Sequence, residues 1–234
     1  MSGEKLLKAW INPVAFLDVD QPSAPPGSQV PSENALLSFL CTPGLPSDPS
    51  AMADRYREIS SEPHRLIAAP AEQRILDKLV WPLRHAKTAY MVGNFLGTIS
   101  LCGMVAEMVA LLRLDLGELQ INNHLMTDDD QKALFGSTFE KLSQDRRVKV
   151  LRAYKLISDD EADAFTLSRT TRRRYLHLWS QDHEKLAGDA VVSFHAAMLL
   201  VTRTIGQDVD DGKILLNPAM VKYLERQGVY EPDE

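Results

Sequence analysis

Apolar residues recur every three or four positions along most of the chain after residue 70, which is the period of a helix with one buried face. In the segment 186–205, for example, Phe194, Met198 and Val201 follow this spacing. No run alternates apolar and polar residues, as a strand with one solvated face does. The pattern therefore predicts an all-α fold.

Capping residues indicate where these helices begin. Ser158 is followed three positions later by Glu161, and Thr127 by Asp130, which is the arrangement of a capping box. Asn94 precedes an apolar run and can cap it. Short helices are expected at 34–40 and 54–60. The longer predicted helices lie at 72–91 with a kink or restart at Pro82, 94–114, 128–134, 144–156, from 158 through SRTTRRRYLHLW, at 186–205 and from 218 to Gly228.

The segment 95–112 is apolar over enough residues to suggest a membrane span. Glu107 lies well inside it, and a carboxylate near the centre of a bilayer costs on the order of 2.5–3.5 kcal/mol. Small and polar residues such as Gly97 and Ser100 weaken the membrane interpretation further. We therefore expect a buried core helix here and no membrane partner.

The distribution of proline divides the chain. Ten of its 13 prolines fall within residues 1–70, where the stretch QPSAPPGSQVPSE has the composition of a linker. Long proline-poor helical periods follow. We expect a Pro-rich extension or partner-docking arm at 1–70, a helical domain at 71–206, and a short C-terminal tail with one helix at 207–234.

The charge balance argues against a chain that binds nucleic acid over its whole surface. The formal net charge is -6 at pH 7. The segment 140–185 is locally positive, with eleven Lys or Arg against eight Asp or Glu. A local anion site is therefore compatible with the acidic chain.

The two cysteines, Cys41 and Cys102, have no close spacing, which excludes a disulfide scaffold and a cysteine-based zinc site. They fit a reducing, intracellular environment. The first residues, MSGEKLLKAW, lack the apolar stretch of a signal peptide. We expect a cytoplasmic protein.

Several catalytic and cofactor motifs are absent from the sequence. It has no dinucleotide glycine fingerprint, no phosphate-binding loop, no HExxH zinc motif and no GxSxG elbow. None of its six histidines pairs with another at ligand spacing. The sequence gives no reason to expect a metal or a cofactor.

One cluster can carry chemistry: four arginines and a histidine lie within nine residues, at Arg169, Arg172, Arg173, Arg174 and His177. An imidazole with an ordinary pKa near 6.5 can take a proton from a ribose hydroxyl or give one to a leaving oxygen. A guanidinium can hold a phosphate and offset charge that builds in a transition state. Together they would suffice for metal-independent cleavage of RNA by the neighbouring 2′-hydroxyl.

The spacing Arg172-x4-His177 resembles the R-x4-6-H motif of HEPN domains, which are small helical bundles that often act as ribonucleases. The order of helices over residues 83–205, including the acid within LCGMVAEMVALL, is similar too. The resemblance implies an up-and-down helical bundle and a metal-independent endoribonuclease in bacterial defence or toxin-like growth arrest.

The same resemblance assigns roles to individual residues. His177 would be the general acid or base, Arg172 would stabilise the phosphorane, and Glu107 would support one of them. The remaining arginines of the cluster would bind the RNA strand: Arg169, Arg173 and Arg174.

Two features leave alternatives open. The family usually has a small polar residue, often Asn, where this chain has Arg173. Residues five apart on an ideal helix also lie about 140° from one another, so Arg172 and His177 are not expected to share a face. The family pairs two protomers so that both motifs line one cleft, which implies a homodimer.

A second interpretation is a catalytically inactive HEPN-like helical module that binds or senses a protein or nucleic-acid partner. The Pro-rich extension and the overall acidity favour it, because an extended arm suits docking onto another protein. A third is an all-α subunit in which the motif is a coincidence.

Overall fold

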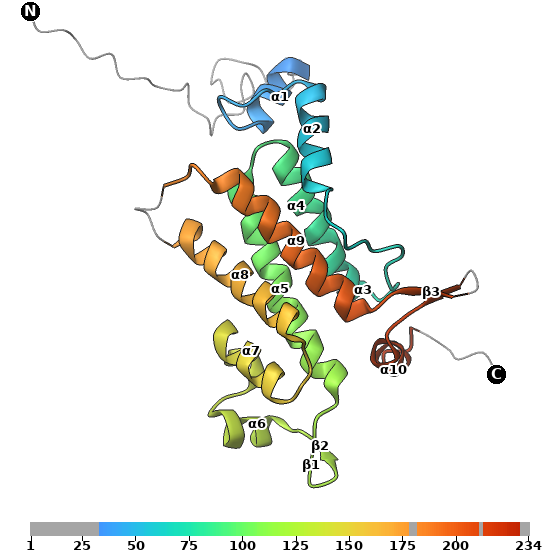
Figure 1. The fold of residues 1–234 in the computed structure, drawn as a ribbon. Helices are drawn as coiled ribbons and strands as arrows, with labels where there is room; N and C mark the ends of the chain where they lie inside the picture. The colour runs from blue at the N-terminus through green and yellow to red at the C-terminus, as the bar shows by residue number, and fades with distance from the viewer. Residues whose placement is uncertain (1–32, 178–181, 211–212, 230–234) are drawn as a thin grey trace, which may run out of the picture.

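The structure is a computed structural model in which residues 33–177, 182–210 and 213–229 are described (Figure 1). The described residues are mostly helical, with very little strand, which confirms the all-α class. The elements in chain order are α1 (Glu33–Leu40), α2 (Pro49–Ile59), α3 (Gln73–Ile75), a π-helical turn (Leu76–Val80), α4 (Trp81–Met91), α5 (Phe95–Gly117), β1 (Gln120–Ile121), β2 (His124–Leu125), α6 (Asp128–Phe135), a 3-10 turn (Phe139–Lys141), α7 (Gln144–Ala153), α8 (Asp159–Leu176), α9 (Leu186–Ile205), β3 (Asp208–Asp210), β4 (Lys213–Leu215) and α10 (Pro218–Arg226).

Four long helices form the centre of the molecule. α5 packs against α4, α8 and α9, while α2 lies on α4 and α9, and α10 lies on α5 (Figure 1). Burial of a large apolar side chain stabilises a fold by about 1.5–3 kcal/mol relative to leaving it exposed. The largest fully buried side chains on these four helices are Tyr90, Ile99, Phe165, Phe194, Leu200 and Ile205.

By length and composition alone, α5 and α9 could each cross a membrane. In this structure they pack against each other in the helical core. α5 buries Ile99, Cys102 and Val109 there. A helix that is apolar on nearly all sides, as α5 is, requires neighbours on several faces, and α4, α8 and α9 provide them.

Three predicted helix starts are confirmed by their capping contacts. Ser158 and Glu161 form a reciprocal capping box at the start of α8, and Thr127 and Asp130 form one at α6. The Asn94 side chain accepts a hydrogen bond from the Gly97 N–H at the start of α5. Each cap satisfies backbone donors that have no partner inside the helix.

The disturbance predicted at Pro82 takes the form of a π-helical turn. This turn covers Leu76–Val80, and the N–H of Trp81 donates to the carbonyl of Leu76, five residues back. Pro82, which has no N–H to donate to the preceding turn, follows as the second residue of α4.

Two short antiparallel hairpins were not predicted. β1 pairs with β2, and β3 with β4. Asn122 and Asn123 join β1 to β2 with φ of 49° and 65°, a conformation that asparagine tolerates better than most residues. Strands of two or three residues carry too little alternation to be recognised in a sequence.

The segment 33–70 contains both helices expected within it. α2 begins at Pro49, earlier than predicted, and its last residue, Ile59, is fully buried in the core. The Thr42 hydroxyl donates to the Gly93 carbonyl at 2.6 Å, and Arg55 Nε donates to the Met91 carbonyl at 2.6 Å. These contacts attach the segment to the turn between α4 and α5. Residues 1–32 of the expected arm lie outside the described residues.

Candidate functional site

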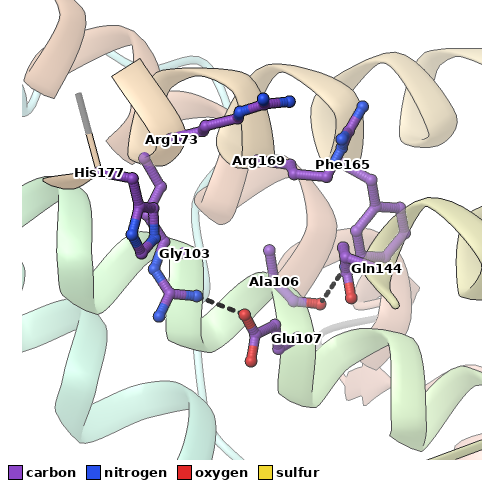
Figure 2. Close-up of a pocket in the computed structure, with 9 residues that line it drawn as sticks. Gly103, Ala106, Glu107, Gln144, Phe165, Arg169, Arg173 and His177 are labelled. Atoms are coloured by element: carbon purple, nitrogen blue, oxygen red, sulfur yellow. Dashed lines mark hydrogen bonds and ion pairs between the residues drawn. The ribbon is translucent and has the colours of Figure 1, made fainter. Parts of the chain in front are cut away.

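A pocket of about 250 Å³ lies between α5 and α8, and the first residue of α7 closes one side of it (Figure 2). Its α5 wall holds one carboxylate, while its α8 wall is rich in cationic side chains. The lining residues are Gly103, Ala106 and Glu107 from α5, Gln144 from α7, and Phe165, Arg169, Arg172, Arg173 and His177 from α8 and its C-terminal cap.

An ion pair joins the two walls. The Arg172 guanidinium donates a hydrogen bond to the Glu107 carboxylate, which Figure 2 marks with a dashed line. Both side chains are partly exposed, at 33% and 37%. A Cβ on Gly103 would lie 2.6 Å from Arg172 Cδ, so the arginine stem occupies space that only a glycine leaves free. Gly103 and Glu107 together fix where the guanidinium lies.

His177 is the C-cap of α8 and departs from helical geometry. Its φ and ψ are -124° and -11°, and its N–H donates to the Arg173 carbonyl at 3.2 Å. His177 and Arg172 line the same pocket. The pocket is wide enough to take side chains that lie about 140° apart around an ideal helix.

The other arginines of the cluster differ in their surroundings. Arg169 lies 3.6 Å from the Asp145 carboxylate. Arg173 is exposed and forms no ion pair with any described residue, which leaves its guanidinium available to an anion. Arg174 does not line the pocket, because it donates at 2.6 Å to Asp189 on α9.

The structure thus brings together five of the six residues singled out in the sequence, all except Arg174. It adds Gln144, whose Nε2 donates to the Ala106 carbonyl at 3.4 Å and so joins α7 to α5. Nothing in the sequence distinguishes Gln144 from any other polar residue at the start of a helix. Gly103 carried a weak signal, since a glycine inside an apolar helix often marks a close approach.

The charges in the pocket favour an anion. Of the three guanidinium groups, Arg172 is paired with Glu107 and Arg169 lies near Asp145, which leaves Arg173 without a counter-charge among the described residues. Phe165, which is fully buried, forms an apolar floor beneath them. Within residues 33–177, 182–210 and 213–229, no group of three His, Cys, Asp or Glu side chains is placed to hold a metal ion. Such a pocket can bind a phosphate and present an imidazole to it.

Comparisons of the chain with protein-family models, with curated proteins and with solved structures found no match.

Proposed function

We propose that this protein is a metal-independent endoribonuclease that cleaves RNA in the pocket between α5 and α8. The observation that carries the proposal is that Arg172, Arg173 and His177 line a single pocket. An endoribonuclease of this kind needs a base, a cation for the transition state and a second cation for the strand. The pocket contains a candidate for each.

His177 is the proposed general base. Its imidazole removes the proton of a 2′-hydroxyl, and O2′ then attacks the adjacent phosphorus. The bond from phosphorus to O5′ breaks, and water supplies the proton that the leaving oxygen needs. The products are a 2′,3′-cyclic phosphate and a 5′-hydroxyl, and the reaction as written requires no metal or cofactor.

Arg172 is the proposed transition-state cation. The phosphorane carries more negative charge than the phosphodiester, and a guanidinium that is already oriented stabilises it without reorganisation. The ion pair with Glu107 supplies that orientation. Arg173, which has no partner among the described residues, would hold a neighbouring phosphate of the strand.

The resemblance to HEPN domains supports the same chemistry. From it we take the expectations of a homodimer, a cytoplasmic location, and a role in bacterial defence or growth arrest. Sedimentation at micromolar concentration tests the homodimer. Since Arg172 and His177 line one pocket of one chain, the chemistry proposed here uses no residue from a second copy.

The test is cleavage of end-labelled RNA in the presence of a chelator. We expect the wild type to cut and to leave 2′,3′-cyclic phosphate ends, while His177→Ala and Arg172→Ala each lose about 10²-fold or more in rate. His85→Ala and Arg203→Ala are matched controls, because both residues are exposed and neither lines the pocket. The two controls should cut like the wild type.

Equal cutting by the wild type and both pocket variants would refute catalysis at this site. A wild type that binds RNA without cutting it, and whose binding weakens in Arg173→Ala, would instead support the inactive binding module.

A further inference from the structure

A second cavity, of about 290 Å³, lies at the C-terminal end of α5. Residues from α3, the β1–β2 hairpin, α6 and α10 complete its lining. It shares no lining residue with the pocket between α5 and α8. A ligand bound in the second cavity would therefore contact none of the residues proposed to cleave RNA.

One part of this second cavity is apolar. Leu114, Leu119 and Met126 line it, and Leu125 lies 53% exposed beside them. An exposed leucine at the edge of a cavity gains from being covered, because burial of apolar area stabilises a complex by roughly 25 cal/mol per Å². This part suits a small aliphatic group.

The opposite part carries charges of both signs. Arg226 contacts the Glu118 carboxylate at 3.0 Å, and Arg74 contacts the Glu72 carboxylate at 2.7 Å. Asp115 forms no hydrogen bond or ion pair with any residue that the structure describes. The Asp115 carboxylate is therefore an acceptor with no donor of its own.

Asp115 is exposed to solvent and its neighbour Tyr223 is 7% exposed, and the two line the same cavity. Partial desolvation raises the pKa of Asp115, although Arg226 and Arg74 act in the opposite direction. Burial also raises the pKa of Tyr223, whose phenol forms no hydrogen bond with a described residue. A hydrogen bond from a charged donor to a carboxylate is stronger than one between neutral groups, so an ammonium group is a suitable partner for Asp115.

These groups restrict the charge of a ligand. An anion would meet the carboxylates of Asp115 and Glu118, and a cation would meet the guanidinium groups of Arg74 and Arg226. An uncharged apolar molecule would leave the Asp115 carboxylate unpaired. A molecule with a positive and a negative group on adjacent atoms satisfies both sets of charges.

We propose that this cavity binds a free α-amino acid with an aliphatic or thioether side chain. Its ammonium group donates to Asp115, its carboxylate accepts from Arg226 and the Tyr223 hydroxyl, and its side chain covers Leu125 and Met126. A volume near the lower end of those typical of ligand pockets accommodates one amino acid. The proposal stands or falls independently of the ribonuclease proposal.

The test is titration calorimetry of the full chain with L-leucine and L-methionine. Two leucine analogues test the contribution of each charged group: 3-methylbutylamine lacks the carboxylate, and 4-methylpentanoic acid lacks the amine. We expect at least one of the two amino acids to bind, and both analogues to bind at least tenfold more weakly than leucine.

Two variants test the assigned contacts. Asp115→Asn should weaken binding of the amino acid at least tenfold, and Tyr223→Phe should weaken it severalfold. Asp163→Asn is the matched control, since Asp163 is exposed on α8, far from the cavity lining. Circular dichroism checks that each variant is folded.

Three results would overturn the proposal. The first is the absence of binding heat with both amino acids. The second is an analogue that binds as tightly as leucine, because one charge would then suffice. The third is a folded Asp115→Asn variant with wild-type affinity.

Discussion

Arg172 on α8 extends past the bare backbone of Gly103 to reach the carboxylate of Glu107 on α5. The position of the guanidinium therefore depends on a residue that has no side chain. Because Gly103 lies inside a helix, its replacement by alanine alters the pocket without altering the backbone conformation. The substitution Gly103→Ala therefore tests the chemistry of the pocket independently of the stability of the fold.

We predict that Gly103→Ala reduces RNA cleavage by about 10²-fold, because a displacement of about 1 Å at a catalytic group can cost that much. The new Cβ would lie 2.6 Å from Arg172 Cδ and would force the arginine away from Glu107. The melting temperature should not fall, since alanine in a helix interior is favoured over glycine by up to about 1 kcal/mol. Cleavage rates and thermal unfolding measured on one preparation check both parts.

Gly188→Ala on α9 is the matched control for this substitution. A Cβ at Gly188 would meet no atom within 4 Å, so the variant gains helix propensity without a collision. It should cut RNA at the wild-type rate. Unchanged cleavage in Gly103→Ala would show that the Arg172 position is not needed for activity.

Glu161 should be among the residues on which stability depends most. Its side chain is 7% exposed, it completes the capping box of α8, and it pairs with Arg113. Glu161→Ala removes the Glu161 half of the capping box, keeps the Ser158 N-cap, and leaves the Arg113 guanidinium without a counter-charge. We expect a loss of about 3–5 kcal/mol in the free energy of unfolding, measured by chemical denaturation.

Two further variants resolve the contributions at this position. Glu161→Gln retains a side chain that can complete a capping box, so it should lose less stability than Glu161→Ala. Asp163→Ala, at an exposed position on the same helix, should change stability by no more than about 0.5 kcal/mol. Equal losses in Glu161→Ala and Asp163→Ala would contradict the role of the buried pair.

Asp130 should make the region around α6 sensitive to acid. Hydrogen bonds from the Thr127 side chain and backbone, and from His124, hold the pKa of Asp130 at about 2, below its ordinary 3.8. A depressed pKa stabilises the fold above pH 4, and this contribution is lost as the pH falls through 2. Asp130→Asn should therefore speed hydrogen exchange of the α6 amides at neutral pH.

The difference between wild type and Asp130→Asn in α6 exchange should shrink below pH 4 and vanish near pH 2. Exchange measured by mass spectrometry between pH 7 and pH 2 gives this profile. A difference that stayed constant across the range would mean that the Asp130 charge is not involved.

The Cys102 thiol should be unreactive in the folded protein. It is fully buried on α5, and burial raises its pKa above the ordinary 9.0, which suppresses the thiolate that reacts with alkylating agents. Cys41, which is also buried, provides an internal comparison. Iodoacetamide should modify Cys102 only in denaturant, whereas rapid native modification would indicate frequent opening of the bundle.

The helix starts were predictable because capping is local. Ser158 and Glu161 are three residues apart, so their contact forms whenever the helix does. The helix ends were less predictable. For example, α6 stops at Phe135 because Gly136 adopts a left-handed conformation, which a glycine can adopt but need not. Pro82 indicated a disturbance, while its form, a π-helical turn, depends on the fit of α4 to its neighbours.

The α8 side of the pocket was predictable from the density of arginine, and on the opposite wall Glu107 was expected as a supporting residue, whereas Gly103 and Ala106 were not. The pairing of Glu107 with Arg172 joins residues 65 positions apart, and only packing of α5 on α8 determines it. Arg174 could not be separated from Arg173, because a rotation of about 100° per residue decides which of them faces the pocket. The position of His177 as the C-cap of α8 was not predicted, because the helix was expected to continue past Leu176.

The turn between α4 and α5 has a separate consequence for how this protein can change. Gly93 has a φ of +80°, and a Cβ there would lie 2.4 Å from Leu45 and 2.9 Å from Thr42. A side chain at this position would have to displace Leu45 and Thr42, and Gly93 does not line the arginine pocket. A change at Gly93 would therefore disturb the attachment of the N-terminal segment without altering any residue that lines that pocket.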